Sequence, residues 1–200
     1  QELESALAQF KGTEAALIFI SCYLANIGTI PTLVEQGGLI LADRLCHASL
    51  IDGCRLSAAD FRIYRHNDTN HLQSLLAKRR RARRTLIVTD GLFSMDGDLA
   101  PLPELSRLAQ DYEADLYIDD AHGTGVMGPH GRGTAEHFGL DTQIPFQMGT
   151  LGKAFGSSGA CLAGPSTFIR YLMNTNRAFI FTTAPPPSSA AAVTAALRII

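Results

Sequence analysis

The feature that most constrains this fold is the alternation of short apolar runs with amphipathic stretches along the whole chain. The predicted strands are AALIFI (15–20), GLILAD (38–43), FRIYRH (61–66), TLIVTD (85–90), ADLYIDD (114–120), IPFQMGT (144–150) and GACLAG (159–164). Helical patterns lie between most of them, including YLANIGTIPTLVEQ, which we expect to be interrupted near Pro31. This order indicates an α/β fold in which helices cover both faces of a mostly parallel sheet.

Composition and charge exclude several classes of protein. The chain has 200 residues, of which 46% are hydrophobic, and a net charge of −2. That is enough chain for one sizeable core, and the balanced charge argues against nucleic acid as a partner. No apolar run is long enough to span a bilayer. The four cysteines, Cys22, Cys46, Cys54 and Cys161, lack CxxC spacing and are typical of a reduced cytoplasmic protein.

Both ends of the sequence lie inside helical patterns. QELESALAQF has no N-cap residue before it, and SSAAAVTAALRII stops without a C-cap. We therefore expect residues 1–200 to be a piece of a longer protein.

Polar and reactive side chains follow five of the predicted strands. They are Ser21, His47, Ser94, Asp119 with His122, and Thr150 with Lys153. In open α/β sheets, ligands bind beyond the carboxyl ends of the strands. If these strands share one sheet, the side chains converge on a single ligand.

The chemistry of these residues favours pyridoxal 5′-phosphate (PLP). The turn SCYLAN offers the free N–H groups of a helix start to a phosphate, and the Thr150 hydroxyl adds a bond. Asp119 suits a protonated ring nitrogen, and His47 can stack on a planar ring. Lys153 lies in the Gly-rich stretch MGTLGKAFGSSGA, where a lysine shielded from water is a nucleophile for an aldehyde.

Each residue taken singly has a plainer interpretation. Asp119 is then a cap, His47 an N-cap or packed histidine, Ser94 a turn former and Lys153 an ordinary loop lysine. The combination of all of them favours the PLP site.

Four other signals are weaker. The stretch GTGVMG (123–128) matches the dinucleotide-binding pattern, but PHGRG follows where a helix is required. Asp119, Asp120 and His122 lack metal-binding spacing, so no metal is expected. No GxSxG elbow surrounds Ser94. The basic run KRRRARR (78–84) is expected to be a solvated turn, with an anionic partner as the alternative.

Four segments carry a resemblance to a known family. TLGKAFGSSGA, DDAHGTGVMG, DGLFSMDGDLAPLPEL and DRLCHASLIDGCRLS closely resemble the α-oxoamine synthases, PLP enzymes of the type I aminotransferase fold. The resemblance extends over the whole chain. It implies that residues 1–200 are the PLP-binding large domain, without an N-terminal segment and a small C-terminal domain.

The resemblance also implies a role for each site residue. Lys153 would bind the cofactor aldehyde, Asp119 the pyridinium nitrogen, and His122 with Ser94 the phenolic oxygen. His47 would stack on the ring. The phosphate would be held by Cys22, Tyr23 and Thr150. Cys22 stands where the family usually has Gly, so its N–H can serve only if its φ is not positive.

Within the family, YRHNDTNHL and DDAHGTG are most similar to the biotin-pathway member. That similarity implies a decarboxylative condensation of L-alanine with a pimeloyl thioester, carried by CoA or acyl carrier protein, in a cytoplasmic homodimer with its active sites at the subunit interface. Alternatives are a family member that uses glycine and acetyl-CoA, an aminotransferase or lyase of the same fold, and a non-catalytic module that binds a protein or RNA through KRRRARR.

Overall fold

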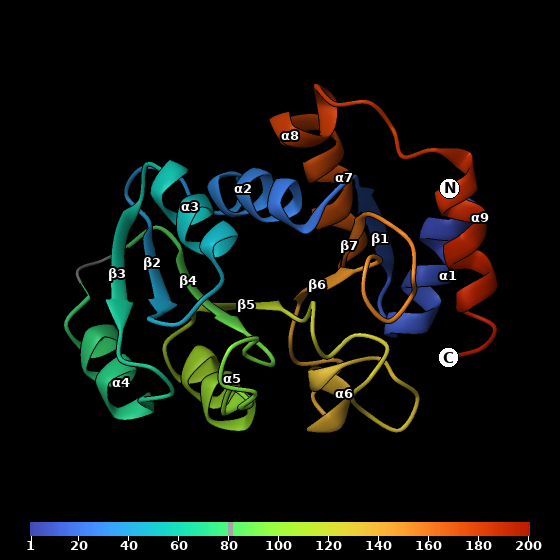
Figure 1. Ribbon diagram of the computed structural model, residues 1–200. Helices are drawn as coiled ribbons and strands as arrows, with labels where there is room; N and C mark the ends of the chain where they lie inside the picture. Colours follow the sequence, from blue (N-terminus) through green and yellow to red (C-terminus); the bar gives the residue numbers. More distant parts are fainter. Residues whose placement is uncertain (80–81) are drawn as a thin grey trace.

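The computed structural model describes residues 1–79 and 82–200 and contains all seven predicted strands in one sheet. They are β1 (Ala15–Phe19), β2 (Leu39–Asp43), β3 (Asp60–Tyr64), β4 (Thr85–Asp90), β5 (Asp115–Asp119), β6 (Phe146–Thr150) and β7 (Ala160–Gly164). The order across the sheet is β1-β7-β6-β5-β4-β2-β3 (Figure 1). The expectation of an α/β fold is confirmed.

Strand direction decides which residues can meet. The strands β6, β5, β4, β2 and β3 are parallel to their neighbours, whereas β7 is antiparallel to both β6 and β1. Six strands therefore point the same way, and their carboxyl ends lie along one edge of the sheet. This is the edge on which the sequence places its polar residues.

Helices connect the strands. They are α1 (Glu2–Lys11), α2 (Cys22–Leu33), α3 (Ala48–Leu56), α4 (Thr69–Ala77), α5 (Leu102–Asp111), α6 (Thr134–His137), α7 (Ser166–Thr175), α8 (Arg177–Ile180) and α9 (Pro187–Ala196). The expected interruption near Pro31 is wrong, because α2 continues through this residue to Leu33. Pro31 lies two residues before the end of the helix, so it removes one intrahelical hydrogen bond and the helix ends shortly after it.

Apolar side chains on both faces of the sheet build the core. One face packs against α2, α3 and α7, through residues such as Ile40, Val88 and Leu162. On the other face, Leu41 and Ile118 pack near α4 and α5, while α1 and α9 cover β1 and β7. Figure 1 shows these helical layers on the two sides of the sheet. Burial on both faces explains why the strands are continuous apolar runs.

In the part of the chain that the structure describes, every helix is too short or too polar to cross a lipid bilayer.

Candidate functional site at the carboxyl edge of the sheet

The start of α2 offers unpaired backbone N–H groups at this edge. Ser21 is the N-cap, and its Oγ accepts a hydrogen bond from Leu24 N at 3.2 Å. Cys22 is the first helical residue, and it is not among the described non-glycine residues with positive φ. The backbone condition set for Cys22 is therefore met. The Tyr23 hydroxyl donates to Asp52 Oδ2 at 2.9 Å, which leaves the backbone N–H of Tyr23 for a ligand.

The end of β6 meets the start of α2. Thr150, the last residue of β6, lies beside the Cys22 thiol, and burial raises the pKa of this thiol. Thr150 Oγ1 accepts from Gly152 N at 3.2 Å. The hydroxyl and the helix N-terminus expected to hold an anion therefore lie side by side.

Lys153 lies in the hairpin turn between β6 and β7. This turn is closed by Leu151 N donating to Gly159 O at 2.9 Å and by Ser157 N donating to Leu151 O at 3.0 Å. The shielding expected for Lys153 is absent, because this residue is exposed.

Asp119 is a buried carboxylate held from two sides. Asn26 Nδ2 donates to its Oδ2 at 2.7 Å, and Ala121 N donates to its Oδ1 at 3.0 Å. Asn26 is itself oriented by the Tyr117 hydroxyl, which donates to Asn26 Oδ1 at 2.7 Å, and its amide also donates to Ser49 Oγ at 2.9 Å. Burial raises the pKa of Asp119. A cation placed beside it would therefore be strongly favoured.

His47 caps α3 and presents an exposed ring. Its Nδ1 lies 2.7 Å from Ser49 Oγ and accepts from Ser49 N at 3.3 Å, so the interpretation as an N-cap is correct. The ring remains exposed and free to stack on a ligand. His47 N donates to Asp90 Oδ2 at 2.8 Å. Burial, together with the charge of Asp119, raises the pKa of Asp90 to about 8.

His122 is half-buried after β5, and Ser94 is exposed after β4. Burial lowers the pKa of His122, and the charges of Lys153 and His47 lower it further. His122 is thus a neutral imidazole near two other basic groups. Among the described residues, Ser94 makes no hydrogen bond with the other site residues.

Three residues that shape this site were missed from the sequence. Asp90 ends a predicted strand, so the rule that identified Asp119 could have found it. Asn26 is a buried amide on an otherwise apolar helix, a signal visible in the sequence. Ser49 gives no comparable signal, because its role depends on where α3 packs against α2.

Asp120, the second acid of DDAH, has a structural role. Asp120 accepts from Thr134 N at 2.9 Å and from Thr134 Oγ1 at 2.7 Å, and its Oδ2 lies 3.6 Å from Lys11 Nζ. Gly133 has φ +121°, and a Cβ there would collide with the Asp120 carboxylate. Residues 123–128 form turns and no helix, which agrees with rejecting the dinucleotide pattern.

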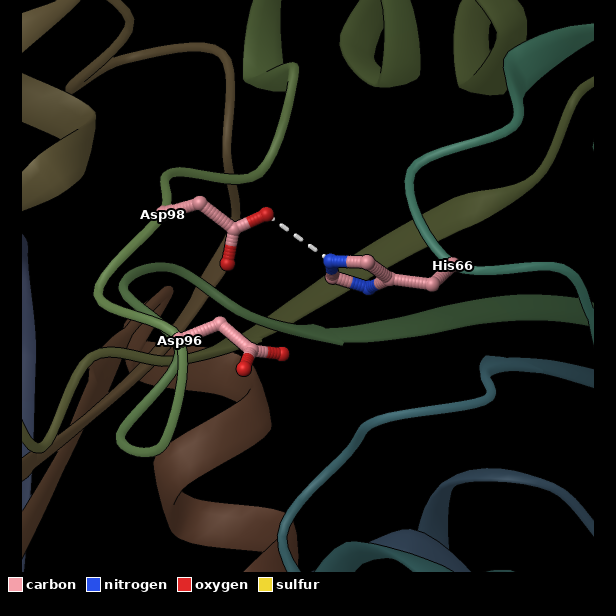
Figure 2. Close-up of side chains that lie close together, drawn as sticks. All are labelled: His66, Asp96 and Asp98. Carbon is pink, nitrogen blue, oxygen red and sulfur yellow. Dashed lines mark hydrogen bonds and ion pairs between the residues drawn. The ribbon is translucent and has the colours of Figure 1, made fainter.

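One group on the same edge resembles a metal site. His66, Asp96 and Asp98 place a ligand atom each within 4.8 Å of one another (Figure 2). His66 already uses both ring nitrogens, one toward Asp98 Oδ2 at 2.8 Å and one toward Asp43 Oδ1 at 2.9 Å. Because both partners only accept, the ring has no lone pair for a metal.

The basic run is partly engaged in contacts. Arg84 Nε lies 2.6 Å from Asp115 Oδ2, and Arg79 Nη1 donates to Thr85 Oγ1 at 3.0 Å. Arg80 and Arg81 lie outside the described residues. The expectation of a solvated turn is therefore tested only in part.

Comparisons with known proteins find similar sequences and folds. The sequence profile of a family described as "Aminotransferase class I and II" matches residues 1–200. An 8-amino-7-oxononanoate synthase of Geobacter sulfurreducens is 57% identical over 198 residues, which cover 99% of this chain and 51% of the relative. The chain thus spans about half the length of the curated relatives it matches.

Solved structures show the same fold. A serine palmitoyltransferase from S. paucimobilis, with a bound PLP–myriocin aldimine, superimposes with a TM-score of 0.95 at 36% identity over 98% of this chain and 50% of that one. An 8-amino-7-oxononanoate synthase from Francisella tularensis gives a TM-score of 0.87 at 33% identity, over 100% and 57% of the two chains. The type I fold implied by the resemblance is confirmed.

Proposed function

This chain belongs to the aminotransferase class I and II family, and from that membership we propose that it is the PLP-binding large domain of an 8-amino-7-oxononanoate synthase. The observation that supports this most directly is the arrangement at the carboxyl edge of the sheet. A buried carboxylate (Asp119), an exposed primary amine (Lys153) and a helix N-terminus capped by Ser21 belong to segments at or directly after the carboxyl ends of β5, β6 and β1. This is the donor set that PLP requires.

The residues fit the cofactor for three physical reasons. The N–H groups of Cys22 and Tyr23, with the Thr150 hydroxyl, suit a phosphate at a helix N-terminus. Burial raises the pKa of Asp119, and among the described residues its carboxylate forms no ion pair. A protonated ring nitrogen supplies a positive partner. Lys153 is accessible to an aldehyde.

The remaining roles rest on the resemblance to the α-oxoamine synthases. The exposed His47 ring is placed to stack on a planar ring, while His122 and Ser94 are assigned to the phenolic oxygen. The neutral His122 can donate or accept one hydrogen bond there, because its pKa is lowered by burial and by nearby basic charges.

The proposed reaction joins L-alanine to a pimeloyl thioester, carried by CoA or acyl carrier protein, with loss of CO₂ and the thiol. The cofactor, when bound, supplies the electron sink for a carbanion at the alanine α-carbon. Lys153 removes the α-proton with its freed amine. Asp119 keeps a proton on the ring nitrogen through its negative charge. The 57% identity to an 8-amino-7-oxononanoate synthase supports this substrate pair.

We also propose that the complete protein is a cytoplasmic homodimer acting on small molecules, with residues outside this chain completing the substrate site. All four cysteines are free, which is consistent with a reducing compartment.

Reductive trapping tests the cofactor assignment. The protein is mixed with PLP, the visible absorption band is recorded, and borohydride is added before peptide mapping. We expect a pyridoxyl group on Lys153, and its loss in Lys153→Ala. Lys78→Ala is the matched control, because Lys78 is exposed and lies away from this edge. A pyridoxyl group spread over several lysines, or none at all, would contradict the proposal.

A second assay addresses the reaction class. In the complete protein, L-alanine is expected to release free thiol from pimeloyl-CoA. An aminotransferase of the same fold consumes an amino acid without releasing thiol, so amino-group transfer alone would overturn the proposed reaction.

A further inference from the structure

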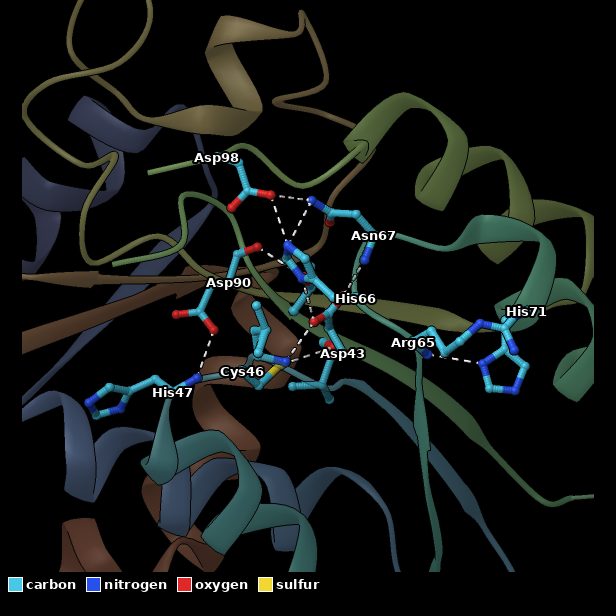
Figure 3. A network of polar contacts seen from close by, with 12 residues as sticks. Asp43, Cys46, His47, Arg65, His66, Asn67, His71, Asp90 and Asp98 are labelled. Carbon is cyan, nitrogen blue, oxygen red and sulfur yellow. Dashed lines mark hydrogen bonds and ion pairs between the residues drawn. The ribbon is translucent and has the colours of Figure 1, made fainter. Parts of the chain in front are cut away.

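His66 joins two turns of the sheet edge that the proposed function uses. It follows β3, the edge strand, and lies between Asp43 and Asp98 (Figure 3). Its Nδ1 lies 2.9 Å from Asp43 Oδ1, and its Nε2 lies 2.8 Å from Asp98 Oδ2. Two carboxylate partners require a proton on both ring nitrogens. The ring is therefore an imidazolium shared by two acids.

The charge state agrees with these contacts. Burial lowers the pKa of His66, because it disfavours the charged ring. The hydrogen bonds that the ring donates to Asp43 and Asp98 outweigh this effect, so the pKa of His66 is raised. Charge-assisted hydrogen bonds of this kind are about twice as strong as neutral ones.

The first turn is organised by Asp43, the fully buried last residue of β2. Its Oδ1 accepts from Leu45 N at 2.8 Å, and its backbone carbonyl accepts from Cys46 N at 3.2 Å. The next residue is His47, whose own N–H donates to Asp90. Asp43 thus sets the path of the backbone that delivers the His47 ring.

The second turn is organised around Asp98. Phe93 N donates to Asp98 O at 3.0 Å, and Gly97 N donates to Phe93 O at 2.9 Å, so these residues close a small loop. The His66 ring packs edge-on against the Phe93 ring at 4.6 Å between centroids. Ser94 directly follows Phe93. His66 therefore contacts this loop on both sides of Ser94.

We propose that His66 is a positioning residue, which bridges Asp43 and Asp98 and thereby fixes the turns that present His47 and Ser94. It touches no cofactor atom and acts through these turns. The predicted effect of His66 on PLP binding rests on the proposed function. The bridge between Asp43 and Asp98 does not depend on that function.

The test breaks the bridge on its exposed side. Asp98→Ala removes the contacts of Asp98 Oδ2 with His66 Nε2 and Asn67 Nδ2, and the Asp98 side chain is 42% exposed, so the protein is expected to stay folded. Asp96→Ala is the matched control, since Asp96 belongs to the same turn and is exposed, without a hydrogen bond to another described side chain. Asp98→Asn keeps an acceptor for Nε2–H and is the rescue variant.

Hydrogen exchange without cofactor gives the first readout. In Asp98→Ala, amides of residues 91–100 should exchange about tenfold faster at an unchanged melting temperature, because a hydrogen bond to a charged group is lost. Asp96→Ala should match the wild type, and Asp98→Asn should recover much of the protection. Equal exchange in all variants would overturn the proposed bridge.

PLP alone as a probe gives the second readout. The dissociation constant for PLP should rise about tenfold in Asp98→Ala, with a shifted absorption band, and should be restored in Asp98→Asn. If the wild type binds no PLP, the proposed function fails while the exchange result still decides the bridge. If PLP binds wild type and Asp98→Ala equally, with the same band, the positioning role is wrong.

Discussion

At the scale of single residues, the site concentrates acids that water does not reach. Asp90 and Asp119 end neighbouring strands, paired directly in register, and both are buried. Burial raises the pKa of both carboxyl groups, and the charge of Asp119 raises that of Asp90 further. Two buried carboxyl groups at neighbouring strand ends favour the binding of a cation there, for electrostatic reasons that do not depend on which ligand carries the charge.

The pH dependence of protein stability should report the raised pKa of Asp90. The pKa of Asp90 is near 4 in an unfolded chain and about 8 in the fold. The folded state thus binds the proton more tightly. The resulting stabilisation is complete below the unfolded pKa and is lost as pH rises through about 8. We expect the melting temperature of the cofactor-free protein to fall between pH 5 and pH 9, measured by calorimetry.

Asp90→Asn should flatten this decline, because asparagine can still accept from His47 N and carries no charge. Asp119 and His66 also have raised pKa values, so some decline should remain. An unaltered slope in Asp90→Asn would show that Asp90 is ionised in the fold.

At the scale of elements, the strands could be predicted and the short helices could not. Most strands are apolar runs, which can be recognised without knowledge of their neighbours, whereas β3 alternates polar Asp60 and Arg62 with apolar residues. The four-residue helices α6 and α8 are too short to show a periodicity and were not predicted. The rule that proline interrupts a helix gave the wrong prediction for Pro31, because the rule does not consider how close the residue lies to the end of the helix.

The site could also be predicted only in part. The strand-end rule located His47, Asp119, Thr150 and Lys153 on one edge, because topology alone brings them there. The exposure of Lys153 and the bond between Asn26 and Asp119 depend on packing between distant segments, which a local pattern does not contain.

The contact between α1 and the loop after β5 should be a strong element-level tie. Lys11 and Asp120 are both fully buried, and Lys11 Nζ also donates to the Arg132 carbonyl. Lys11→Met leaves the Asp120 carboxylate without its cation, which should lower the free energy of unfolding by about 3–5 kcal/mol in urea titrations. The exposed control Lys78→Met should change it by less than about 0.5 kcal/mol.

Adding Asp120→Asn to Lys11→Met should recover part of this loss, since no charge then stays buried alone. If the single variant were as stable as the wild type, the pair would contribute no net stability.

At the scale of the whole molecule, two helical layers share one sheet, so the cores should unfold together. Cys54 is a buried residue of α3 in the core on one face of the sheet, and Cys161 of β7 belongs to the core on the other face. Pulsed alkylation across a urea series, with the modified peptides resolved by mass spectrometry, should give both thiols the same midpoint. Separate midpoints would show that one face opens independently.

The antiparallel insertion of β7 gives Lys153 a particular kind of freedom. Its turn is anchored at both ends in adjacent strands, so the amine explores only the small volume that its own side chain can sweep. The Lys153 amine therefore behaves as a tethered reactant, and its effective concentration near this edge is far above that of a free amine in solution. Under the proposed function, an amino acid that displaces the Lys153 amine would have to compete with an amine that stays held in its turn.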